Sequence, residues 1–171
     1  YRDSDIFKVG CIFKSFVSAM AGIALQDNKI QSLDQRVLDF YPEISANGID
    51  GSFSLLTLKH VMTKTSGICW PGLGEKLPSD MHEVFALRFK DVPGESFEYK
   101  PDPQIIVYLI EDLYGINFID LINERLFKPL GIKRWSWDRD NIEGMRISVD
   151  DLSLFGQLYL NKGIYQGKQY F

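Results

Sequence analysis

The chain has 171 residues, 45% of them hydrophobic, and a formal net charge of −4. This length supports one sizeable core, so we predict a single domain over residues 1–171. The acidic pI of about 5.2 argues against nucleic acid and anionic membrane surfaces as partners, and no apolar run is long enough to span a bilayer. Because the chain begins at Tyr1 rather than Met, we expect it to be a fragment of a longer protein.

The first predicted helix begins just after Gly10 and ends near Asn28, a residue type that commonly stops helices in the left-handed conformation. Between Val9 and Gln26 the only charged residue is Lys14. A helix that is apolar on nearly every face is typical of a buried helix. A lysine one turn into such a helix is costly unless the protein uses it.

Cys11 lies three residues before Lys14, and positions three apart share a helix face. A helix N-terminus favours negative charge and therefore a thiolate. A lysine in apolar surroundings loses proton affinity and can act as a base for a neighbouring nucleophile. The pair predicts acyl-transfer chemistry. The alternative is structural: Cys11 is a small buried residue and the amine of Lys14 reaches water along its aliphatic stem.

The remaining helices are predicted from caps, stops and apolar stripes. Trp135 and Trp137 alternate with polar residues, which predicts a short strand. The helical segments are a short turn that begins at 32–34, runs through Val37, Leu38 and Phe40 and is stopped by Pro42, a helix over 58–64 capped by Thr57, one over 80–89 capped by Ser79, one from Pro103 to Gly115, one over 118–127, and one over 149–162 capped by Ser148. Between two of them runs a loop over 68–78. Its Trp70 has two readings, as the lining of a substrate pocket or as a ring packed on the first helix.

The segment Cys11-Ile12-Phe13-Lys14-Ser15-Phe16-Val17-Ser18-Ala19 resembles the S-x-x-K-S-F-x-S-A segment of the serine β-lactamase and penicillin-binding-protein superfamily, most closely its class C-like branch. The resemblance continues through segments at 22–30, 33–42, 58–67 and 155–160, so it covers nearly the whole chain. It implies that Cys11 stands where the family has its nucleophilic serine. No other serine of the chain is followed by a lysine three residues later.

The resemblance implies a mostly α chain, the helical portion of the α+β β-lactamase/transpeptidase-like fold with its C-terminal sheet strands missing. It also implies that Tyr99 is the proton shuttle, assisted by Lys14. The family's Asn or Ser two residues after this tyrosine is replaced by Pro101, which has no side-chain donor. Asp102 is the next polar residue that could contact a substrate. The alternative for Tyr99 is an ordinary half-buried tyrosine.

The family's third motif, K-T-G or H-x-G, lies on a strand beyond this sequence, and that strand carries one of two oxyanion-hole N–H groups. The other would be the backbone N–H of Cys11. Losing one such donor costs roughly 100- to 1,000-fold in rate, so we expect the 171-residue piece alone to be inactive.

These observations favour a bacterial β-lactamase-related hydrolase that acts on an amide or ester through a covalent acyl-enzyme. One alternative is a catalytically inactive member that binds a peptide-like or cell-wall-like ligand. Another is that Cys11 is an engineered replacement of serine. No cofactor or metal is expected, because His60 and His82 have no ligand partners at metal-binding spacing. Cys11 and Cys69 are expected to be free thiols. Self-association through an uncovered apolar face is a further expectation, while the substrate and the compartment (periplasmic, extracellular or cytoplasmic) stay open.

Overall fold

The computed structural model describes residues 5–44, 48–72, 75–137 and 144–171. The chain divides into two compact units, one formed by residues 1–29 with 114–171 and the other by residues 30–113. Regular structure in both units is mainly helical, with a few short strands, which confirms the predicted fold class. None of the described helices is both long and apolar enough to cross a bilayer.

The first unit contains a small antiparallel sheet that brings the start of the chain to residues far along it. Its central strand is β3 (Arg146–Ser148), which pairs with β1 (Ile6–Lys8) on one side and β2 (Trp135–Ser136) on the other. Phe7 and Trp135 both lie opposite Ile147. The predicted strand around residue 135 is therefore present.

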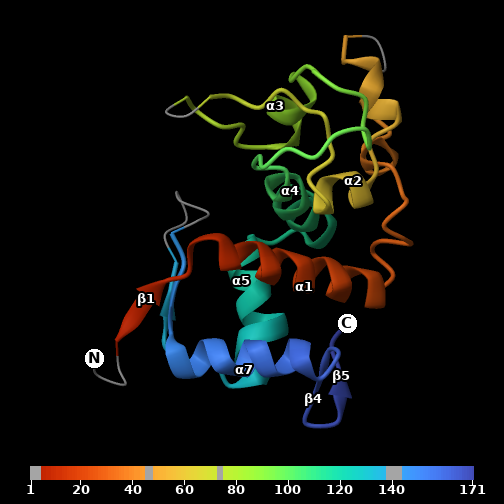
Figure 1. The fold of residues 1–171 in the computed structure, drawn as a ribbon. Helices are drawn as coiled ribbons and strands as arrows, with labels where there is room; N and C mark the ends of the chain where they lie inside the picture. Colours follow the sequence, from red (N-terminus) through yellow and green to blue (C-terminus); the bar gives the residue numbers. More distant parts are fainter. Residues whose placement is uncertain (1–4, 45–47, 73–74, 138–143) are drawn as a thin grey trace. The chain divides into compact units, whose positions relative to one another are not determined.

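Two long helices leave this sheet. The 3-10 turn η1 (Gly10–Ile12) leads from β1 into α1 (Phe13–Gln26), and β3 continues directly into α7 (Val149–Leu160). Because β1 and β3 are antiparallel, the two helices start at opposite ends of the sheet and then run in the same direction (Figure 1). The unit also contains α5 (Phe118–Ile122), the π-helical segment η4 (Asn123–Phe127), α6 (Lys128–Leu130), and a hairpin of β4 (Ile164–Tyr165) and β5 (Lys168–Gln169).

An aromatic cluster fills the space between these helices. The Phe16 ring on α1 is completely buried and stacks on Phe155 of α7 with 3.8 Å between ring centroids. Phe127 of η4 meets the same ring edge-on at 5.5 Å. The apolar run that predicted a buried helix is thus used for packing, since aromatic pairs of this kind add to the stability gained by burial alone.

The predicted end of α1 and the predicted start of α7 agree with the structure, whereas α7 ends at Leu160, two residues before the predicted end. Asn28 has a left-handed φ of +58°, directly after the last turn of α1. Ser148 caps α7, because its Oγ accepts a hydrogen bond of 3.1 Å from the N–H of Asp151. Both ends are therefore set by local chemistry that the sequence displays.

The second unit is built around α4 (Pro103–Tyr114), whose last residue already belongs to the first unit. Its aromatic core is centred on Phe53, which is fully buried and meets Phe85 at 4.9 Å and Phe89 at 4.8 Å between ring centroids. The shorter elements of this unit are η2 (Val37–Phe40), η3 (Gly51–Ser54), α2 (Leu58–Met62) and α3 (Met81–Phe85).

The predicted helix over 80–89 with Ser79 as its cap is wrong in two respects. The cap is Asp80, whose carboxylate accepts from the N–H of Glu83 at 2.9 Å, and the helix ends at Phe85. Ser79 donates its own N–H and its hydroxyl to the Glu83 carboxylate instead, at 2.8 and 3.1 Å. Serine and aspartate are both common N-cap residues, and in this helix Asp80 rather than Ser79 is the N-cap.

Candidate functional site

Cys11 lies in η1, the turn between β1 and α1, and its side chain is exposed. The turn is held by backbone hydrogen bonds, from the N–H of Val9 to the carbonyl of Met145 at 3.0 Å and from that of Ile12 to the carbonyl of Val9 at 3.2 Å. Gly10 supplies a left-handed φ of +52°. The thiol therefore lies at the surface, two residues before Phe13, the first residue of α1, and not in the buried position that the structural alternative requires.

Lys14 is the second residue of α1 and is half-buried. The residue before it, Phe13, is buried and packs edge-on against Trp137 with 5.0 Å between ring centroids. Ser15, the residue after Lys14, is linked to α7, because its carbonyl accepts a 2.8 Å hydrogen bond from the hydroxyl of Tyr159. The start of α1, which carries the lysine, is therefore fixed by contacts on both sides of Lys14.

Tyr99 belongs to the second unit, in the irregular segment that precedes α4. Its side chain is 58% exposed, so it is not the half-buried tyrosine of the structural alternative. The ammonium group of Lys64 lies 4.3 Å from the centre of its ring. A cation at this distance from a phenol ring is attracted to it.

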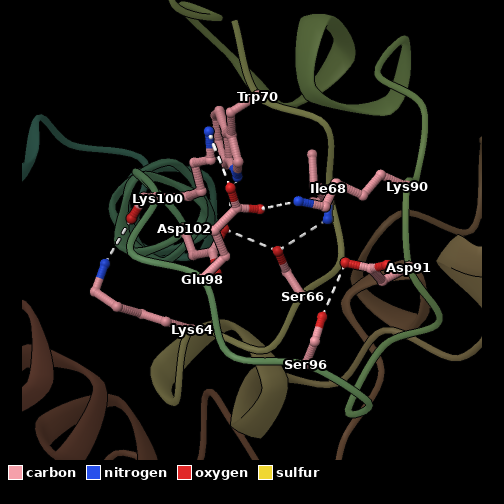
Figure 2. Close-up of polar contacts among 10 residues, drawn as sticks. All are labelled: Lys64, Ser66, Ile68, Trp70, Lys90, Asp91, Ser96, Glu98, Lys100 and Asp102. Atoms are coloured by element: carbon pink, nitrogen blue, oxygen red, sulfur yellow. Dashed lines mark hydrogen bonds and ion pairs between the residues drawn. The ribbon is translucent and has the colours of Figure 1, made fainter. Parts of the chain in front are cut away.

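Asp102 and Trp70 meet in a buried polar cluster of the second unit (Figure 2). The Asp102 side chain is 1% exposed, and its Oδ1 accepts hydrogen bonds from Nε1 of Trp70 at 2.6 Å and from Oγ of Ser66 at 2.8 Å. The Ser66 hydroxyl in turn accepts from the N–H of Ile68 at 3.2 Å. Burial raises the pKa of Asp102, although both hydrogen bonds act in the opposite direction.

The two residues that flank Tyr99, Glu98 and Lys100, also form ion pairs at the surface. Glu98 forms ion pairs with Lys90 at 3.0 Å and with Lys100 at 3.3 Å (Figure 2). The hydrogen bond from Lys90 is the main reason why the pKa of Glu98 is lowered. These contacts fix the main chain on either side of Tyr99.

The predicted residues are divided between the two units, and among them Trp70 and Asp102 are in direct contact. Cys11 and Lys14 lie in the first unit, and Trp70, Tyr99 and Asp102 in the second. Two residues that the sequence reasoning did not select for the site also lie in the second unit, Ser66 as a donor to Asp102 and Lys64 beside Tyr99. The Thr-Ser-Gly sequence at 65–67 was a visible signal for Ser66, whereas nothing in the sequence marked Lys64.

No metal-binding cluster is apparent in the part of the chain that the structure describes. Nowhere among residues 5–44, 48–72, 75–137 and 144–171 do three or more His, Cys, Asp or Glu side chains gather closely enough to hold an ion.

Comparison with known proteins was made for both sequence and structure. The protein-family model described as Beta-lactamase matches residues 1–151 of the chain. A candidate beta-lactamase from Bacteroides dorei DSM 17855 has a similar structure, with a TM-score of 0.85 at 18% identity over 100% of this chain and 55% of its own.

Two further solved structures extend this similarity. A candidate 6-aminohexanoate-dimer hydrolase from Bacillus anthracis has a TM-score of 0.78 at 20% identity, covering 99% of this chain and 51% of its own. A class C beta-lactamase in complex with cefoxitin has a TM-score of 0.78 at 20% identity, covering 99% and 54%. The chain thus spans about half the length of these proteins. At such identities the likeness establishes a shared fold.

Proposed function

Since the chain belongs to the beta-lactamase family, we propose that the full-length protein is an acyl-transfer hydrolase that cleaves an amide or ester bond through a covalent acyl-enzyme. In this proposal Cys11 is the nucleophile, Lys14 its base and Tyr99 the proton shuttle. The observation that carries the proposal is the position of Cys11. Its thiol is exposed in the turn that leads into α1, with a half-buried lysine in the first helical turn.

The chemistry requires a neutral amine at Lys14 when the substrate arrives. The amine takes the thiol proton, the thiolate sulfur of Cys11 bonds to the substrate carbonyl carbon, and the carbon–nitrogen or carbon–oxygen bond breaks. The departing amine or alcohol receives a proton by way of Tyr99. Water then attacks the thioester, releasing a carboxylic acid and restoring the thiol. A thiolate forms far more readily than an alkoxide, so cysteine is chemically competent in this role.

We assign Trp70 and Asp102 an indirect part in substrate binding. Both are buried, and Oδ1 of Asp102 already accepts two hydrogen bonds. Because only 1% of Asp102 is exposed, a substrate could reach this carboxylate only if the buried cluster opened. Asp102 instead fixes the main chain three residues after Tyr99, at the start of α4.

The test is intact-mass analysis of the full-length protein after incubation with a penicillin and a panel of activated esters. We expect a single adduct on Cys11 that is absent from Cys11→Ala and strongly reduced in Lys14→Ala. Cys69→Ala is the matched control, because Cys69 is also exposed and would capture any indiscriminate acylating reagent. An adduct that survives Cys11→Ala, or that disappears with Cys69→Ala, would refute the proposal.

A second candidate is a catalytically inactive protein that binds a peptide-like or cell-wall-like ligand. The observation that favours it is the sequence after Tyr99, where Pro101 offers no side-chain donor and Asp102 is turned into the buried cluster. In that case folded protein would form no adduct with any acyl donor, yet a peptide-like ligand would raise its melting temperature. Turnover that depends on both Cys11 and Lys14 would exclude this candidate.

A further inference from the structure

Lys64 has an unusual main-chain conformation. It follows α2 in the turn that closes the helix and has a left-handed φ of +59°. Residues with a Cβ atom enter this region at a cost, whereas glycine does so freely. The conformation alone assigns no role to the lysine, since Lys162 adopts a similar φ of +52°, so the contacts of the Lys64 side chain have to carry the argument.

The main chain and side chain of Lys64 hold the residues on both sides of Tyr99. Its carbonyl accepts a hydrogen bond of 2.9 Å from the N–H of Glu98, and its Nζ donates to the carbonyl of Lys100 at 2.5 Å (Figure 2). Lys64 is thus hydrogen-bonded to the first and the last residue of the segment 98–100. Tyr99 is the residue between them.

The ammonium group of Lys64 also interacts with the Tyr99 ring and, through its charge, with the carboxylate of Asp102. Nζ lies 4.3 Å from the ring centroid, within the range at which cations bind aromatic faces. Its charge also opposes the effect of burial on Asp102, where burial remains dominant and the pKa is raised. Lys64 therefore contacts the Tyr99 ring and also the main chain of the residues before and after Tyr99.

We propose that Lys64 is a positioning residue that fixes the direction of the Tyr99 phenol during acyl transfer, an inference that rests on the function proposed above. The lysine touches neither substrate nor nucleophile in this role. It keeps the proton shuttle in one orientation by holding the ring face and the carbonyl that follows it.

The decisive variant is Lys64→Gly. Glycine suits a φ of +59° better than lysine does, so we expect the folded state to be as stable as the wild type or more stable. The loss of the cation and of the hydrogen bond to Lys100 should lower kcat about tenfold, a change within the range of one such contact. KM should stay unchanged, since substrate binding does not depend on the shuttle.

Lys162→Gly is the matched control. Lys162 is exposed, has a left-handed φ of +52°, lies after the end of α7 and has no role in the proposal. The same relief of backbone strain is expected there with no change in kcat. A further variant, Lys64→Arg, keeps the cation and should retain most of the activity that Lys64→Met loses.

The wild type is measured first, so that two failures can be told apart. A wild type without acyl transfer overturns the proposed function and the role of Lys64 together. A wild type with turnover and a Lys64→Gly variant with the same kcat overturns the role of Lys64 alone. If Lys64→Gly unfolds more easily than the wild type, the comparison of Lys64→Arg with Lys64→Met decides, and equal kcat values in these two variants overturn the inference.

Discussion

The indole N–H of Trp70 donates a hydrogen bond of 2.6 Å to Oδ1 of Asp102, and this bond ties the loop after α2 to the residue that precedes α4. Both side chains are almost fully buried, at 4% and 1% exposure. A buried carboxylate is tolerated only when hydrogen bonds satisfy it. The contact therefore has consequences for stability that can be measured.

Trp70→Phe should destabilise the folded protein by about 1–3 kcal/mol, because it removes a donor to a buried carboxylate and leaves that oxygen less satisfied. Urea denaturation of the variant measures this loss. Trp135→Phe is the control, since that ring mainly packs edge-on against Phe127 at 5.1 Å and phenylalanine can preserve such packing. A loss at Trp70 no larger than that at Trp135 would contradict the importance of the hydrogen bond.

Asp102 should make the protein less stable as the pH rises. Burial raises the pKa of this carboxyl in the folded state above its ordinary value of 3.8, so the folded chain binds the proton more tightly than the unfolded chain. The resulting stability is fully present below the ordinary value and is lost as the pH rises through the raised one. Asp102→Asn keeps an oxygen acceptor for Trp70 and Ser66 but cannot ionise.

The free energy of unfolding, measured from just below the ordinary aspartate pKa towards neutral pH, should therefore fall in the wild type relative to Asp102→Asn. Parallel curves for the two proteins would show that this carboxyl does not titrate differently on folding.

Asp27 should make the protein less stable as the pH falls, the opposite of the effect of Asp102. Both guanidinium nitrogens of Arg125 contact its carboxylate, at 2.7 and 2.8 Å, and the hydroxyl of Tyr114 donates to it at 2.6 Å. The hydrogen bond from Arg125 is the largest of the effects that keep the pKa of Asp27 below 3.8. This stability is present above the ordinary value and is lost as the pH falls through the lowered one.

Arg125→Met should accordingly cost about 1 kcal/mol at neutral pH, a figure already reduced for the partial exposure of the pair, and should weaken the dependence on acid. Thermal denaturation at several pH values tests both effects. Arg36→Met is the matched control. The Arg36–Asp39 pair is equally close, at 2.7 Å, but more exposed, so its loss should change stability less than the loss of Arg125.

Gly22→Ala should destabilise the protein even though alanine is the better helix former. Gly22 lies within α1, and a Cβ atom added there would sit 2.5 Å from Cβ of Phe171. The gain in helix propensity, roughly 1 kcal/mol at most, cannot offset such an overlap. Gly156→Ala in α7 is the control, because a Cβ atom there meets no other atom within 4 Å.

Gly156→Ala should raise the unfolding midpoint while Gly22→Ala lowers it. If both variants gain stability, the end of the chain does not pack on α1 as described.

The sequence predicted those features whose causes are local. The limits of α1 follow from its apolar run and from Asn28, and the start of α7 follows from Ser148. The placement of Cys11 and Lys14 at the start of the first helix likewise followed from their spacing, whereas the exposure of Cys11 is seen only in the structure. In contrast, the bond between Trp70 and Asp102 and the contact between Lys64 and Tyr99 join residues more than thirty positions apart. No periodicity relates such residues, so only the folded chain reveals them.

Cys11 and Cys69 are the only two cysteines of the chain, both are exposed, and each belongs to a different unit. The sequence therefore carries one attachment point for a spin label or fluorophore on each unit, and no further cysteine has to be introduced. Pulsed electron paramagnetic resonance between the two labels would read the spacing of the units directly.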